Sequence, residues 1–152
     1  DPEAMQEKDN MLIAAFYGGV AITASGTTGV HALSYPLGGK YHIAHGVSNA
    51  MLLEPVMRFN KDACLDEFEQ IYDAVMPAAS GMGKEEKADA VLERMSQIIR
   101  YLQIPSSLAE FHVQEEELDA LVEAGMQVTR LLVNNRKTIT PADARRIYQE
   151  IL

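Results

Sequence analysis

The sequence predicts an all-α fold, a multi-helix bundle of about six or seven helices joined by short connections. Apolar residues recur at helical spacing along most of the chain, capping residues stand at element ends, and alternating strand patterns are nearly absent. A chain of 152 residues with 47% hydrophobic content can bury a core without disulfides. We therefore expect residues 1–152 to form a single helical domain.

The first expected element is an apolar helix over about residues 11–24. No Asp, Glu, Lys or Arg occurs from Met11 to Gly39. The continuous apolar run of about 14 residues is shorter than the roughly 20 that cross a bilayer, and a helix apolar on every side is typical of the centre of a bundle. We expect a buried core helix here, with a membrane-anchored helix over residues 11–33 as the competing interpretation.

The next segment combines a proline, two adjacent glycines and three histidines. Pro36 disfavours helix at the residue before it, and the Gly38–Gly39 pair permits a sharp reversal of the backbone. Apolar spacing resumes after His45, which indicates that this residue lies near the start of a new helix. We expect this connection to let His31, near the end of one helix, face His45.

Four amphipathic helices are expected after that one. Asn60 is a plausible N-cap for the first of them, and Pro77 with the glycines that follow would end it. For the last, Thr140 offers a capping hydroxyl and Pro141 suits the first helical position. The expected ranges are residues 65–76, 84–103, 114–128 and 141–152.

The charge balance excludes some classes of partner. The chain carries 13 Lys and Arg against 22 Asp and Glu, a net charge of -9. That sign opposes binding to nucleic acid and to anionic membrane surfaces. Cys64 is the single cysteine and the N-terminus is acidic, so we expect a cytoplasmic protein with Cys64 buried as an apolar residue.

Three of the four histidines fall between positions 31 and 45. Neutral imidazole is a common ligand of zinc, iron and copper, so His31 and His45 are candidate metal ligands, with His42 and His45 as a second arrangement. The residues alone favour structural roles for these histidines over metal binding. A tight site needs further ligands, and no Asp in this chain is followed four residues later by His.

The histidine segment carries a specific motif. It consists of Gly29-Val-His31-Ala32, Tyr35-Pro36-Leu37-Gly38-Gly39, Ala44-His45-Gly46-Val47-Ser48-Asn49-Ala50 and Phe59-Asn60. With these residues the sequence resembles the iron-containing, or group III, alcohol dehydrogenases. The resemblance covers nearly the whole chain and implies the dehydroquinate synthase-like, all-helical C-terminal domain of that family.

The resemblance also implies a reaction and separate roles for two domains. Family members oxidise an alcohol to an aldehyde or ketone reversibly, using iron, or zinc in some, as a Lewis acid while NAD or NADP accepts hydride. An N-terminal α/β domain binds the nucleotide, and an Asp with three His holds the metal. His31 and His45 match two of these histidines. The chain would thus be a fragment, inactive alone, that lacks the nucleotide-binding domain and two ligands.

Further site residues and partners follow from the same resemblance. Tyr35 occupies the position of a non-ligand histidine near nicotinamide and substrate in many members, and is a candidate catalytic residue. Ala44 replaces a frequent proline, and Ile22 and Leu131 match residues of the substrate pocket. The expected partners are a small alcohol or aldehyde, the missing domain and further copies of the chain in a homo-oligomer. The rival interpretation is a non-catalytic helical interaction module.

Overall fold

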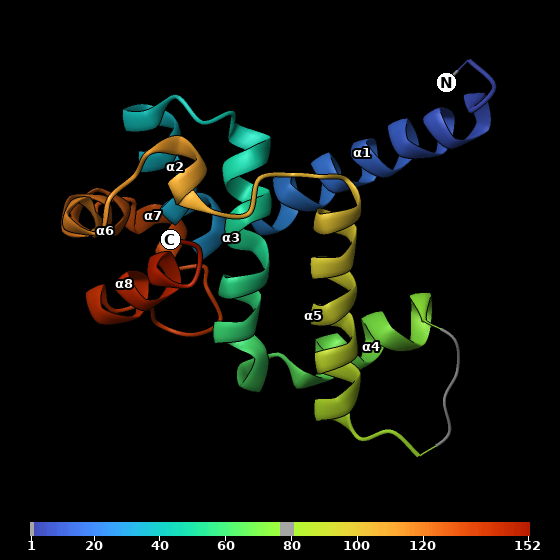
Figure 1. Ribbon diagram of the computed structural model, residues 1–152. Coiled ribbons are helices and arrows are strands. Elements are labelled where there is room, and N and C mark those ends of the chain that lie inside the picture. The colour runs from blue at the N-terminus through green and yellow to red at the C-terminus, as the bar shows by residue number, and fades with distance from the viewer. Residues whose placement is uncertain (1, 77–80) are drawn as a thin grey trace.

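The computed structural model describes residues 2–76 and 81–152, and within these ranges the regular elements are all helical (Figure 1). The predicted all-α fold is confirmed. The α-helices are α1 (Met5–Ser25), α2 (Gly29–Tyr41), α3 (His45–Asn60), α4 (Leu65–Val75), α5 (Lys84–Tyr101), α6 (Leu118–Met126), α7 (Thr129–Leu132) and α8 (Pro141–Gln149). Short 3-10 helices are η1 (Lys61–Ala63), η2 (Leu108–Phe111) and η3 (Glu115–Glu117).

The larger core lies where α2 packs against α3 and α6, and α8 packs against both of these helices. Leu33 and Leu37 of α2 are fully buried there, against side chains that include Leu52 and Leu121. The buried Tyr148 hydroxyl of α8 donates a hydrogen bond to the Leu33 carbonyl at 2.6 Å. This core therefore holds α2 from several sides.

A second core joins α4 to α5. Phe68 of α4 and Leu92 of α5 are buried in it, and Lys87 pairs with Glu69 and Asp73 across the helix pair. In Figure 1 this pair lies to the right of α6 and α8, with α3 between the two groups. The predicted end of α4 at Pro77 lies outside the described residues.

The predicted buried core helix is wrong for α1. It projects from the rest of the molecule in Figure 1, and none of its residues is buried. Phe16, for example, is 68% exposed. Gly26, with φ at +73°, follows the end of α1. The chain bends by 107° between α1 and α2, so residues 11–33 do not form one helix. Among the described residues no single helix has the length and hydropathy of a membrane span, and α1 meets that test only jointly with α2 across the bend.

The predicted break within the histidine segment is also wrong. Helix α2 continues through Pro36 and the Gly38–Gly39 pair, and the left-handed residue that ends it is His42, with φ at +56°. His31 accordingly lies in the first turn of α2, not at the end of the preceding helix. Proline inside a helix costs a hydrogen bond and strain, which burial of the surrounding helix in the core offsets.

Of the other predicted helix boundaries, some are confirmed and some are wrong. Thr140 caps α8 as expected, accepting from the Asp143 backbone N–H at 3.2 Å. Asn60 instead ends α3 and exchanges side-chain hydrogen bonds with Asn135 at 3.1 and 2.8 Å, so it is not a cap for α4. The helix predicted over residues 114–128 is split into η3 and α6, whereas Cys64 is buried as predicted.

Candidate metal centre

The candidate centre lies where the first turn of α3 meets the beginning of α2. His42 turns the chain at the end of α2, and the buried Ile43 donates its backbone N–H to the Leu37 carbonyl at 3.4 Å. This connection turns the chain back along α2. His45, the first residue of α3, therefore reaches His31.

Three aromatic rings meet at this corner. The ring centroids of His31 and His45 lie 5.3 Å apart with an interplanar angle of 61°. The Tyr35 ring is 6.5 Å from His31 and 5.8 Å from His45. The predicted meeting of His31 with His45 is thus found, and Tyr35 stands beside the pair with 40% of its surface exposed.

The two histidines direct the same ring atom to one neighbour. Nδ2 of Asn49 lies 3.0 Å from Nε2 of His45 and 3.4 Å from Nε2 of His31. Both Nε2 atoms therefore converge on one place at the junction of the helices. Converging ring nitrogens are what a shared cation requires.

The protonation state of His31 suits metal binding. Desolvation by burial lowers its pKa below the ordinary value, with repulsion from His45 as the second cause. The lowered pKa favours the neutral ring, the form in which imidazole binds metals.

The donor set fits half of a metal site. Two imidazoles with convergent Nε2 atoms suit iron or zinc. The described residues contain no group of three or more His, Cys, Asp or Glu side chains that could hold an ion together. A closed site therefore needs ligands beyond His31 and His45.

An open groove of about 350 Å³ adjoins the pair, lined by His31 and Asn49 together with apolar and small residues of α1, α2 and α3. Ile22, which the resemblance places at the substrate pocket, lines this groove. Leu131, the other such residue, is only 4% exposed and is not among the residues that line it.

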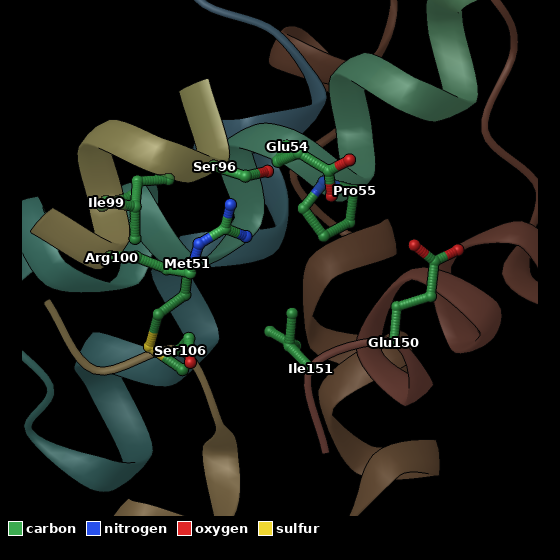
Figure 2. Close-up of a pocket in the computed structure, with 10 residues that line it drawn as sticks. Met51, Glu54, Pro55, Ser96, Ile99, Arg100, Ser106, Glu150 and Ile151 are labelled. Carbon is green, nitrogen blue, oxygen red and sulfur yellow. The ribbon is translucent and has the colours of Figure 1, made fainter. Parts of the chain in front are cut away.

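A separate crevice of about 270 Å³ lies between α3, α5 and the C-terminal segment (Figure 2). Its charged side chains are Glu54, Arg100 and Glu150, and no histidine lines it. Burial, with repulsion from Glu54, raises the pKa of Glu150. This crevice lacks the imidazole donors of the α2–α3 corner.

Sequence reasoning did not single out Asn49, and it considered His42 as an alternative partner of His45. Asn49 was visible as part of the motif, and its spacing of four residues from His45 places both on one helix face. His42 is exposed at the turn, and the rings that approach His45 are those of His31 and Tyr35.

Fold and site together define a class of protein: an all-helical domain that presents two imidazoles at the corner between two helices. Residues 1–152 match the C-terminal part of the Fe-containing alcohol dehydrogenase family. The chain belongs to this family.

Individual relatives agree with that assignment. Long-chain-alcohol dehydrogenase 1 of Geobacillus thermodenitrificans is 34% identical over 144 residues, which are 95% of this chain and 36% of that protein. Alcohol dehydrogenase 4 of Schizosaccharomyces pombe is 36% identical over 123 residues, covering 80% of this chain and 28% of the relative. The crystal structure of the archaeal halo-thermophilic Red Sea brine pool alcohol dehydrogenase has a TM-score of 0.86 at 25% identity, covering 100% of this chain and 39% of that one. The chain spans about a third of the length of such relatives.

Proposed function

We propose that this chain is the metal-bearing helical part of an NAD(P)-dependent alcohol dehydrogenase that interconverts an alcohol and an aldehyde or ketone. His31 and His45 would hold iron, or zinc, as two of its ligands. The observation that carries the proposal is the convergence of their Nε2 atoms on the Asn49 amide, at 3.4 and 3.0 Å. Family membership supplies the reaction class.

The residues of the corner have distinct roles in this proposal. When bound, the metal held by His31 and His45 would supply Lewis-acid polarisation of the alcohol oxygen, and the nicotinamide cofactor would supply the hydride acceptor. His31 and His45 would hold and orient the ion, and burial lowers the pKa of His31, which favours the neutral form that binds metal. Tyr35 stands beside the pair, where its hydroxyl can contact substrate or nicotinamide, and Ile22 gives the groove an apolar wall for the substrate's carbon chain.

The rest of the enzyme must supply what the corner lacks. We propose that the nucleotide-binding domain and the remaining ligands, an Asp and a His by the family resemblance, lie in the part of the relatives that this chain does not span. The shortage of ligands among the described residues supports this division. The 152-residue chain alone is then expected to be inactive.

The exposed apolar surface of α1 supports the same division. Its exposed side chains include Leu12, Phe16 and Val20, and a continuous apolar surface of this kind marks a contact region. In the enzyme we propose that the remaining domain covers it. In the isolated chain we expect the same surface to favour association of copies. Phe16→Lys should lower the associated fraction, because it adds a charge to this surface. Sedimentation velocity of the native and variant chains measures the difference.

Metal retention and turnover test the site assignment. In a full-length enzyme that carries this chain, His31→Ala or His45→Ala should abolish both iron retention and NAD(P)-coupled alcohol oxidation, because each variant removes a ligand. His42→Asn is the matched control, since Asn tolerates the left-handed backbone at φ +56° and the side chain is exposed.

The outcomes separate the two interpretations of the chain. Loss in both ligand variants with retention in the control supports the metal centre. Full metal content and turnover in either ligand variant would refute it. An enzyme that holds no metal and has no activity even with native residues would instead favour the helical interaction module.

A further inference from the structure

Asn49 lies between the two imidazoles, four residues beyond His45 on α3. From its Nδ2 the distance is 3.0 Å to Nε2 of His45 and 3.4 Å to Nε2 of His31. We propose that Asn49 is a positioning residue, which fixes both histidines as the tautomer with its proton on Nδ1 and so turns both Nε2 lone pairs toward one point. This inference rests on the proposed function and deepens it.

The argument begins with the hydrogen-bonding capacity of the groups. An Asn Nδ2 carries two N–H donors, and a neutral imidazole has one donor and one acceptor nitrogen. One N–H can therefore serve each ring, provided that each Nε2 is unprotonated. The proton of each ring then sits on Nδ1, and the Nε2 lone pair, the atom that would bind a metal, faces the amide.

The opposite orientation of the Asn49 amide is disfavoured because it would bury two N–H donors without partners. Oδ1 of Asn49 is buried and has no hydrogen-bond partner among the described residues. If the amide were reversed, its NH₂ group would occupy that place, leaving two donors unpaired instead of one acceptor. Each unpaired buried polar group costs about 1–3 kcal/mol, so the orientation with Nδ2 toward the histidines is favoured.

The distances from Nδ2 of Asn49 to the two Nε2 atoms are similar to the distance between two ligands of one metal ion. Two nitrogens bound to one zinc at about 2.0–2.1 Å in tetrahedral geometry lie about 3.3 Å from each other. Nδ2 of Asn49 stands 3.0 and 3.4 Å from the two Nε2 atoms. The amide thus keeps both Nε2 lone pairs directed to one place, and its Nδ2 lies at the distance from each ring that a third ligand of a shared ion would have.

The tautomer states give the first test, on the metal-free 152-residue chain at a pH where its imidazoles are neutral. Nitrogen chemical shifts distinguish protonated from unprotonated ring nitrogens. In the native chain we expect unprotonated Nε2 atoms in both His31 and His45. Asn49→Leu keeps a similar volume but cannot donate, so both rings should lose this preference, whereas Asn10→Leu on exposed α1 should leave it unchanged.

A carboxylate at the same place gives the second test. Asn49→Asp puts an oxygen at ligand spacing from both Nε2 atoms, which creates a set of two His and one carboxylate. Titrated with Zn²⁺ alone, this variant should bind at least about tenfold more tightly than the native chain, because it adds an anionic ligand. The double variant His45→Ala with Asn49→Asp should lose the gain.

The two tests can overturn the inference without reference to catalysis. Unchanged histidine tautomers in a folded Asn49→Leu chain would refute it, as would native-like Zn²⁺ affinity in a folded Asn49→Asp chain. Circular dichroism establishes folding in each case. The proposed function has a separate test. It is refuted if the His31 or His45 variant of the full-length enzyme keeps its metal and its turnover.

Discussion

Helices α1 and α2 share one uncharged stretch of sequence but differ in burial. No charged residue occurs from Met11 to Gly39, yet α2 has six buried residues and α1 has none. The turn at Gly26 separates them, and α3, α6 and α7 pack against α2. Apolar composition therefore indicates that a surface needs a partner, but it does not identify that partner.

The largest expected contrast comes from truncating one apolar side chain in each helix. Leu33→Ala in α2 should lower the free energy of unfolding by about 2–5 kcal/mol, because Leu33 is fully buried and the change leaves a cavity. Ile13→Ala in α1 should change it by no more than about 0.5 kcal/mol, since that side chain is 55% exposed. Urea unfolding of both variants measures the difference, and equal losses would contradict the exposed position of α1.

Glycine substitutions should differ in sign between the helices. A Cβ at Gly29 of α2 would lie 2.5 Å from Ile139 Cδ1 and 3.1 Å from Asn135 Oδ1, so Gly29→Ala should destabilise by about 1–3 kcal/mol. Nothing lies within 4 Å of a Cβ at Gly18 of α1, so Gly18→Ala should stabilise that helix by about 0.5–1 kcal/mol. Thermal melts followed by circular dichroism decide the signs, and destabilisation by Gly18→Ala would show that something already covers α1.

A smaller contrast comes from removing one hydroxyl. Tyr148→Phe leaves the ring in place but removes the 2.6 Å hydrogen bond to the Leu33 carbonyl, and should cost about 1 kcal/mol. Tyr17→Phe on exposed α1 is the matched control and should have no measurable effect. Chemical denaturation gives both values, and a neutral Tyr148→Phe variant would show that α8 does not hold α2 through this bond.

The smallest effect concerns the pH response at the end of α8, the helix that holds α2. Burial and Glu54 raise the pKa of Glu150 in the folded chain. The folded state therefore favours the protonated acid, and this stabilisation is present below the unfolded-state pKa and is lost as pH rises through the folded value. Glu150→Gln should raise stability at about pH 7 by less than about 0.5 kcal/mol, after solvent screening, and have no effect near pH 4. A gain that is larger at pH 4 would contradict this sign.

Local signals in the sequence predicted much of the fold. The all-α class, the start of α3 at His45 and the Thr140 cap each depend on a few neighbouring residues, and each is confirmed. The continuation of α2 through Pro36 was missed, because burial of that helix outweighs the local preference. Asn60 was misassigned for a similar reason, since its partner Asn135 is distant in sequence.

The candidate site was predictable in part. The spacing and motif indicated that His31 and His45 would meet, and their rings do lie together. The motif included Asn49, but its position between the two rings depends on how α2 and α3 pack. The exposure of α1 could not be predicted from composition, because an unpartnered apolar helix and a buried one have the same sequence pattern.

The most direct test of the proposed metal centre is anomalous X-ray diffraction at the metal's absorption edge, on crystals of a full-length enzyme that carries this chain and is loaded with iron or zinc. We predict one peak about 2.0–2.2 Å from Nε2 of both His31 and His45. A peak bonded to neither ring, or the two rings turned away from a common ion, would contradict the account.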